Sequence, residues 1–317
     1  MTAAFADVKV VTSIKPVHSL VAAVMQGVGT PDLIVEGAGS PHTYALKPSQ
    51  AKQLQEADLV FWMSHDLEAF LEKSIDGIAT KALSVPLMES RGLMTLGFRD
   101  GGAFDDHGHD EHDDHDEHDK DDDHDHEKHD DHDDHEKHDE HDHGEVDPHV
   151  WLDPENAKAM VHEIEEALAK ADPANAATYE SNAEAVMAKL DSLVAEIDSE
   201  LQPVKGRGYI VFHDAYQYFE NRFGVSAIGS ITVSPEVLPG AERISDLQEK
   251  VRSLDATCVF SEPQFEPKLV ATVTENTNAR TGVLDPLGAA IDKGPNLYFT
   301  LIRNMASSLK NCLLGSG

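Results

Sequence analysis

Residues 209–231 read YIVFHDAYQYFENRFGVSAIGSI. The run Tyr209–His213 predicts a strand, Asp214–Arg222 predicts a helix, and Ala227–Ile231 predicts a second strand. Two short strands joined through a helix are typical of a βαβ unit, whose strands run parallel in one sheet. We therefore expect this part of the chain to form an α/β fold.

The same alternation of strands and helices runs through both halves of the chain. The other predicted strands are Val8–Thr12, Asp32–Val35, Leu59–Met63, Ala82–Leu87, Thr257–Ser261 and Thr281–Leu284. The other predicted helices are Pro16–Gly27, Pro48–Glu56, Asp66–Gly77, Pro154–Lys170, Glu242–Ser253, Glu266–Asn278 and Leu297–Asn311. We predict two similar α/β lobes with mainly parallel sheets, residues 7–172 and residues 205–317.

A long helix is predicted between the two lobes, within residues 173–204. Its apolar positions recur at spacings of four and three, and they are Tyr179, Ala183, Val186, Leu190, Leu193, Ile197 and Leu201. Neither Gly nor Pro interrupts the pattern before Pro203. Such a helix is roughly 40 Å long. A single helix is a stiff connection, so we expect only small closing motions between the lobes.

The chain is strongly acidic, with a formal net charge of −34 over 317 residues. A protein of this charge cannot neutralise phosphates, so we exclude nucleic acid as a partner. Hydrophobic residues make up 40% of the chain, which is enough for a sizeable core. No run reaches the roughly 18 apolar residues that a membrane-spanning helix needs, so we expect no stable membrane insertion.

Two features bear on the cellular compartment. Met1–Ala6 ends in a small-residue pattern like a signal-peptide cleavage site, and we interpret it as the remnant of a signal peptide whose front part is missing. An ordinary cytosolic N-terminus is the alternative. A disulfide between Cys258 and Cys312 would add about 4 kcal/mol in the chain-entropy model and would indicate an oxidising compartment. Two unrelated buried thiols are the alternative.

A histidine-rich acidic segment interrupts the first lobe over residues 104–146. Residues 105–147 contain 24 acidic side chains and three lysines, and residues 105–145 contain no apolar side chain. Without apolar surface to bury, the segment should be disordered in the absence of metal. Its 13 histidines are His107, His109, His112, His115, His118, His124, His126, His129, His132, His135, His138, His141 and His143.

A solvated acidic linker is the usual interpretation of such a charge run. Acidity alone does not require histidine, however, and imidazole with carboxylate is a donor set for Zn²⁺, Cu²⁺ or Ni²⁺. We therefore predict several exchangeable metal sites in this segment. They should be weaker than a preformed site, because binding must order the chain.

Four other residues form a candidate metal site. His42 lies in the loop after a predicted strand, His213 ends a predicted strand, and His149 precedes a predicted helix. Asp285 ends the last predicted strand. Ligands of open α/β sheets bind outside the carboxyl ends of the strands, so these side chains would converge if those edges of the two lobes face each other. Three imidazoles with a carboxylate or water are a tetrahedral Zn²⁺ site.

Six stretches of the chain resemble a known family. They are SIKP at 13–16, PHTYALKPS at 41–49, ADLV at 57–60, DPHVWLDP at 147–154, FHDAY at 212–216 and LDPLG at 284–288. They are similar to the metal-binding solute-receptor family of bacterial ABC transporters, and to its zinc branch above all. The resemblance runs from about Asp7 to the end of the chain.

The resemblance implies a fold and a ligand set. It implies two (β/α)₄ lobes joined by a rigid helix, with the metal in the cleft between them. It implies His42, His149 and His213 as ligands, and Asp285 as a carboxylate that binds the metal or lies close to it. Manganese-type relatives tend to have a carboxylate where His213 stands, and hard Mn²⁺ prefers oxygen donors. Some zinc-branch members have an acidic residue where this chain has Pro41, so either Asp285 or water would be the fourth ligand.

The resemblance also implies a function. The chain would be a monomeric periplasmic receptor that captures Zn²⁺ as the transported ligand and delivers it to the membrane permease of a zinc ABC importer. The histidine-rich segment would act as an auxiliary low-affinity zinc collector or sensor. A Cys258–Cys312 disulfide is also implied.

Two other functions would also use a site of three histidines. A zinc hydrolase would use an open coordination position to activate water, but the chain has no H-E-x-x-H helix and no glutamate obviously placed as a base. We therefore expect no enzyme. A metal buffer or adhesin without a transporter remains an alternative. Asp153 and Asp214 would either orient imidazoles or cap helices.

Overall fold

The structure is a computed structural model of the chain. It describes residues 8–99, 146–232, 235, 239–253 and 258–315. The predictions for Met1–Ala6 and for residues 104–145 lie outside the described residues, and so do all 13 histidines of the acidic segment.

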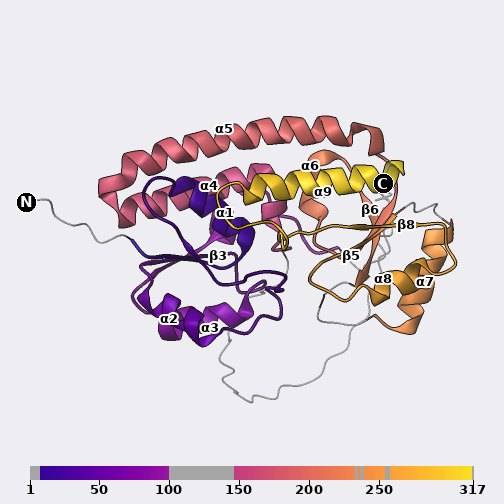
Figure 1. Ribbon diagram of the computed structural model, residues 1–317, viewed down its shortest axis with the longest axis horizontal. Coiled ribbons are helices and arrows are strands. Elements are labelled where there is room, and N and C mark those ends of the chain that lie inside the picture. Colours follow the sequence, from indigo (N-terminus) through magenta and orange to yellow (C-terminus); the bar gives the residue numbers. More distant parts are fainter. Residues whose placement is uncertain (1–7, 100–145, 233–234, 236–238, 254–257, 316–317) are drawn as a thin grey trace, which may run out of the picture. The chain divides into compact units, whose positions relative to one another are not determined.

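Four parallel strands form the first sheet, in the order β2-β1-β3-β4 (Figure 1). The strands are β1 Val10–Thr12, β2 Asp32–Leu33, β3 Leu59–Trp62 and β4 Leu83–Pro86. The central strands β1 and β3 are buried throughout, as expected for a parallel sheet that is covered on both faces. Figure 1 shows which helices cover it: α1 Lys15–Val24 and α4 Pro154–Ala171 on one face, and α2 Pro48–Glu56 and α3 Ala69–Ile78 on the other.

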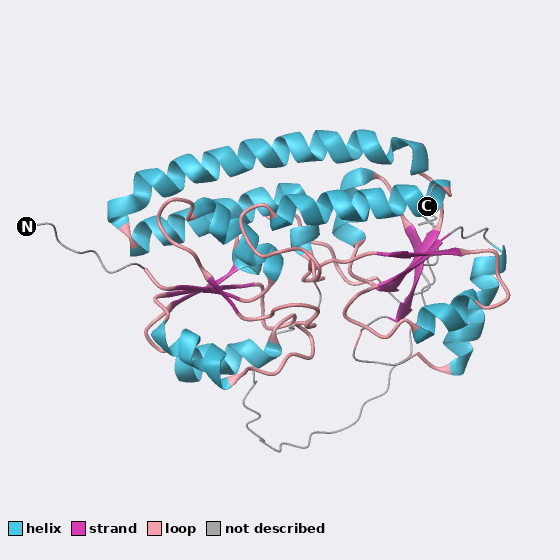
Figure 2. Ribbon diagram, in the orientation of Figure 1, coloured by secondary structure: helices cyan, strands magenta, loops and turns pink. Residues whose placement is uncertain are grey.

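The second sheet repeats this topology, with the order β6-β5-β7-β8 and all strands parallel. Figure 2 shows its strands as a second group of arrows with helices beside them. Its strands are β5 Tyr209–His213, β6 Ala227–Thr232, β7 Cys258–Ser261 and β8 Arg280–Val283. The helices of this half are α6 Gln217–Phe223, α7 Ala241–Ser253, α8 Lys268–Thr274 and α9 Leu297–Leu314. The predicted α/β class with two mainly parallel sheets is confirmed.

The topology locates the binding edge of each sheet. The chain runs from β1 outward to β2 and then crosses back to β3, and it does the same from β5 to β6 and β7. A crevice opens at the carboxyl ends of the two central strands, where successive connections leave in opposite directions. In the second sheet this point lies directly after His213, the last residue of β5.

The long helix α5, Ala176–Leu201, is present between the two sheets in sequence. Short 3₁₀ turns flank it at Pro173–Asn175 and Gln202–Val204. It packs against α1, α4 and α9, and its buried residues are the seven predicted ones: Tyr179, Ala183, Val186, Leu190, Leu193, Ile197 and Leu201. The described residues form one compact unit, so the lobe boundaries and the small lobe motion remain predictions.

Cys258 and Cys312 form the predicted disulfide. It joins β7 in the sheet to α9 near the end of the described chain. Since α9 also packs against α1 and α5, the disulfide ties the second sheet to the helices beside the first. Within the described residues, we find no helix of the length and apolarity needed to cross a membrane.

Some helix boundaries differ from the prediction for a local reason. The helix predicted from Asp66 begins at Ala69, because the Glu68 carboxylate turns back and accepts hydrogen bonds from the amides of Met63 and Ser64. The helix predicted from Asp214 begins at Gln217. Ala215 N donates to His213 O there, which forms a tight turn at the end of β5.

Candidate metal centre

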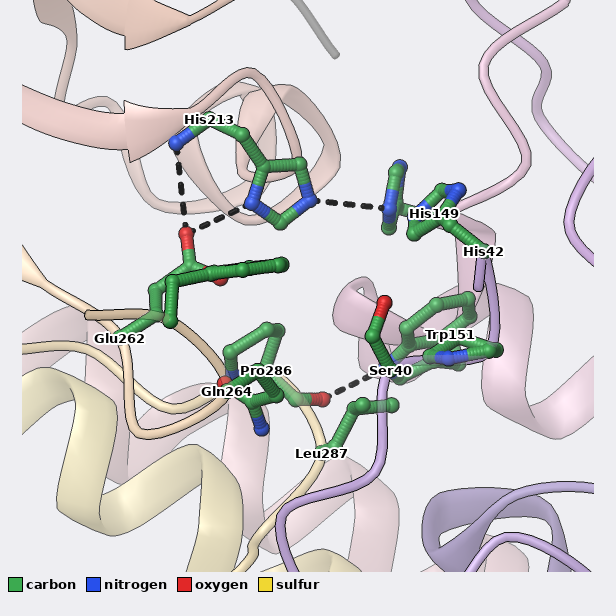
Figure 3. A pocket seen from close by; sticks show the side chains of 11 residues that line it. Ser40, His42, His149, Trp151, His213, Glu262, Gln264, Pro286 and Leu287 are labelled. Atoms are coloured by element: carbon green, nitrogen blue, oxygen red, sulfur yellow. Dashed lines mark hydrogen bonds and ion pairs between the residues drawn. The ribbon is translucent and has the colours of Figure 1, made fainter. Parts of the chain in front are cut away.

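Three histidines from separate parts of the chain meet in one pocket (Figure 3). One nitrogen from each of His42, His149 and His213 lies within 4.8 Å of the other two. The Nε2 atoms of His149 and His213 are 3.4 Å apart. Tetrahedral zinc with bonds of about 2.1 Å places neighbouring ligand nitrogens about 3.4 Å apart. The spacing of this pair therefore fits a zinc ion bound between them.

Each histidine is held at the end of a regular element or in a short connection. His213 is the last residue of β5, so its side chain lies at the carboxyl edge of the second sheet. His149 directly precedes the 3₁₀ turn Val150–Leu152 that leads into α4. His42 lies in the connection between β2 and α2, beyond the carboxyl end of β2. The connection after β2, the end of β5 and the segment before α4 each supply one ring.

Buried carboxylates orient two of the rings. Asp147 Oδ1 accepts a hydrogen bond from His149 Nδ1 at 2.6 Å, and Glu262 Oε1 accepts one from His213 Nδ1 at 2.7 Å. Both carboxylates are buried. A carboxylate that accepts from Nδ1–H leaves the lone pair of Nε2 free to bind a metal, and it makes the imidazole a stronger base. Figure 3 shows Glu262 beside His213, with the His213 Nε2 directed towards His149.

The sequence prediction missed Asp147 and Glu262. Asp147 stands two residues before His149, and its Oδ1 also accepts from the His149 backbone amide at 2.9 Å. This local Asp-Pro-His turn could have been recognised from the spacing. Glu262 directly follows β7, which neighbours β5 in the sheet, so the edge rule for parallel strands could have pointed to it.

The local environment shifts two of the imidazole pKa values in opposite directions. Burial, together with the smaller effects of the neighbouring rings of His149 and His213, lowers the pKa of His42 to about 2. Burial also acts to lower the pKa of His213, but the charge and hydrogen bond of Glu262 outweigh it and raise that pKa above its ordinary value. His42 is thus neutral and ready to bind a metal, whereas a proton competes for His213.

The walls of the pocket are largely apolar. Pro41 lies on the side of the first sheet, and Phe265, Pro286 and Leu287 lie on the side of the second. Trp151 packs against His149 with ring centroids 5.2 Å apart, and its Nε1 donates to Pro286 O at 2.9 Å. Apolar walls exclude water, which strengthens the interaction of the imidazoles with a cation.

The family model described as ZnuA, "Zinc-uptake complex component A periplasmic", matches residues 10–312. The chain belongs to the ZnuA family. It is 59% identical over 304 residues to the high-affinity zinc uptake system protein ZnuA of Brucella abortus (strain 2308), covering 96% of this chain and 91% of that protein.

Two solved structures share the fold of this ZnuA-family chain. A crystal structure of ZnuA matches with a TM-score of 0.76 and 23% identity, covering 97% of this chain and 99% of that one. The laminin-binding protein Lmb of Streptococcus agalactiae, titled as bifunctional with adhesin and metal-transporting activity, matches with a TM-score of 0.74 and 22% identity, covering 97% and 100%. The resemblance predicted from the sequence is confirmed, and so is the expectation of a transport component that is not an enzyme.

Asp285 does not belong to the group of three histidines. Its Oδ1 accepts hydrogen bonds from Gln264 Nε2, Leu287 N and Gly288 N at 2.9–3.1 Å. Its Oδ2 accepts from Ala289 N at 2.6 Å. Both oxygens therefore take part in shaping the loop after β8, and a role as fourth ligand would compete with these bonds. That role stays a prediction.

Asp153 and Asp214 do not contact the rings as orienting groups. Asp153 caps α4 by accepting from Glu155 N, and it also pairs with Arg222 at 2.7 Å. Asp214 pairs with Arg99. Helix capping is thus the role of Asp153, and the orienting role falls to Asp147 and Glu262.

Proposed function

We propose that the chain is a periplasmic zinc receptor that binds one Zn²⁺ through His42, His149 and His213 and delivers it to the permease of an ABC importer. The observation that carries the proposal is the convergence of three imidazoles, two of which have Nδ1 held by a buried carboxylate. Imidazole is a better ligand for Zn²⁺ than for Mn²⁺ or Mg²⁺, which prefer oxygen. The names of the 59% identical relatives support the same cargo.

The fourth coordination position is proposed to hold water or Asp285. Water is favoured by the four hydrogen bonds that Asp285 already accepts from its own loop and from Gln264. A site that keeps an exchangeable ligand can release its ion without breaking a further bond to the protein. Such a site suits a receptor, whose cargo must leave again.

The histidine-rich segment is proposed to collect zinc or to report on its supply. This proposal rests on composition, since 13 imidazoles stand among carboxylates there. Its sites would exchange quickly because binding must order the chain. The preformed pocket would then hold its ion more tightly than the segment does.

Competition between the protein and a chelator of known affinity tests the proposal. The full chain should show one tight Zn²⁺ site and several weak ones. Replacing His42, His149 and His213 with alanine together should remove the tight site and leave the weak ones. As a control, replacing the exposed His65 and His162, which lie outside the pocket, should change neither class. Tight binding that survives the triple replacement would refute the site.

A further inference from the structure

A buried lysine connects the helices of the first sheet to the loop that forms one wall of the pocket. Lys15 is the first residue of α1, and only 6% of it is exposed. Its ammonium donates to three backbone carbonyls, Gly288 O at 2.6 Å, Ala289 O at 3.0 Å and Ile291 O at 2.6 Å. Since a lysine ammonium has three donors, all of its hydrogen-bonding capacity is used by this one loop.

A charged lysine at this position costs free energy unless the hydrogen bonds from the loop compensate for it. The N-terminus of a helix carries a partial positive charge and repels cations. Burial also disfavours the charged form and lowers the pKa of Lys15, against the charges of Asp285, Asp292 and Glu36. Methionine or leucine would fill the same space without these costs. The three carbonyls that accept from the ammonium indicate that it has a specific structural role here.

The loop between β8 and α9 is shaped from both sides by opposite charges. The Ala289 N–H donates to Asp285, and the carbonyl of the same peptide unit, Gly288 O, accepts from Lys15. That peptide dipole therefore lies between a carboxylate and an ammonium, which both stabilise one orientation. Gly288 has φ +70, and a Cβ there would lie 3.2 Å from the Ile291 side chain, so the turn requires glycine.

The same loop closes the metal pocket. Pro286 and Leu287 line it, directly after Asp285. Pro286 O accepts from the Trp151 indole, whose ring packs against His149 (Figure 3). Lys15 is thus connected through one short loop to the pocket wall, and through Pro286 to Trp151, which packs against the proposed ligand His149.

We propose that Lys15 is a positioning residue that holds the Pro286–Leu287 wall closed over the metal and thereby slows release of the ion. The inference rests on the proposed function as a zinc receptor. Without the ammonium, three carbonyls lose their donor and the wall loses its connection to α1. The affinity changes mainly through the rate of dissociation, because tuning of a preformed site usually affects the off-rate.

The test measures zinc release from the full chain loaded with one equivalent of Zn²⁺ and mixed with an excess of chromogenic chelator. Release from the pocket is identified as the slow phase that disappears when His42, His149 and His213 are replaced with alanine together. Lys15→Met and Lys15→Ala should accelerate this phase about tenfold, as expected from the loss of charged hydrogen bonds. Ser19→Ala is the matched control, since it removes the bond from Tyr298 N to Ser19 Oγ between α1 and α9 but leaves the loop intact. It should leave the slow phase unchanged.

Chemical rescue separates a positioning role from general weakening. The side chain that Lys15→Ala removes corresponds to n-propylammonium, which should slow release again in this variant and should have little effect on Lys15→Met, where the space is filled. Tetramethylammonium has the same charge but no N–H donors, and it should not rescue. If neither lysine variant folds, Gly288→Ala disturbs the same loop and should accelerate release likewise.

Release at the wild-type rate in the lysine variants would overturn the inference. So would acceleration that propylammonium does not reverse, or an equal acceleration in Ser19→Ala. If the wild-type chain has no slow phase that depends on the three histidines, the proposed function itself fails. A slow phase that exists but is indifferent to Lys15 rejects only the present inference.

Discussion

Replacing Glu262 with glutamine removes the negative charge behind His213 and keeps the shape of the side chain. The amide oxygen of glutamine can still accept from His213 Nδ1, so the ring should keep the tautomer that exposes Nε2. What is lost is the charge that strengthens the imidazole as a ligand. Groups in this position are worth roughly 10- to 100-fold in metal affinity. Because the hydrogen bond survives, we expect the lower end, a loss of about tenfold or about 1.4 kcal/mol.

The loss should shrink as the pH falls. In the wild-type protein Glu262 raises the pKa of His213, so a proton begins to compete with zinc at a higher pH. In Glu262→Gln that pKa is lower, and proton competition begins later. Zinc affinity of the variant therefore decreases less steeply on acidification, and the ratio of wild-type to variant affinity should be larger at about pH 8 than at about pH 6.

Chelator competition at both pH values gives this ratio directly. Glu266→Gln, an exposed glutamate four residues further along the chain, serves as the control for the loss of one charge. Its affinity ratio should stay close to one at either pH. A Glu262→Gln ratio that is close to one at both values, or that grows on acidification, would refute the reasoning that Glu262 acts through His213.

Three further predictions concern stability and the loop after β8. Burial raises the pKa of Glu68 to about 7, so the native state keeps a proton that the unfolded state releases near pH 4.5. The free energy of unfolding should therefore fall by roughly 3 kcal/mol as the pH rises from about 4.5 to above 7. In urea unfolding, Glu68→Gln should show a much weaker fall over the same pH range. Replacing Cys258 and Cys312 with serine should lower the free energy of unfolding by about 2–4 kcal/mol in the same assay and leave tight zinc binding intact. Asp285→Asn should speed zinc release, since it weakens the turn, but the Co²⁺ absorption spectrum should keep its wild-type form; a changed spectrum would instead support Asp285 as a ligand.

The fold was predictable because its signals are local. Buried β-branched runs such as Tyr209–His213 and the unbroken helical spacing from Tyr179 to Leu201 each depend on residues close in sequence. Helix starts were less accurate, because a side chain that folds back on the preceding strand overrides the pattern. Glu68 does so by accepting from Met63 and Ser64, and it delays α3 to Ala69.

The edge rule pointed to His42 and His213, and the family resemblance added His149, but the carboxylates that orient the rings were not predicted. Asp214 directly follows His213, and Asp153 lies four residues after His149, so both were candidates for orienting carboxylates. The structure uses Asp153 as a helix cap and pairs Asp214 with Arg99. Glu262 lies 49 residues from His213 and reaches it only because β7 pairs with β5. Contacts of this kind depend on the register of the sheet, which composition and spacing do not report.

The charges around the pocket also bear on the choice of metal. If the three imidazoles bind as neutral ligands, as proposed, a bound Zn²⁺ would keep its full double charge in a site with apolar walls. A buried charge is costly unless it is compensated nearby. Asp147 and Glu262 supply two negative charges, each one imidazole away from the ion. A divalent ion with two such carboxylates is balanced, whereas a monovalent ion such as Cu⁺ would leave an excess negative charge. We therefore expect the pocket to discriminate by charge through Asp147 and Glu262 and by donor type through the imidazoles, and replacing both carboxylates with amides should weaken Zn²⁺ binding far more than Cu⁺ binding.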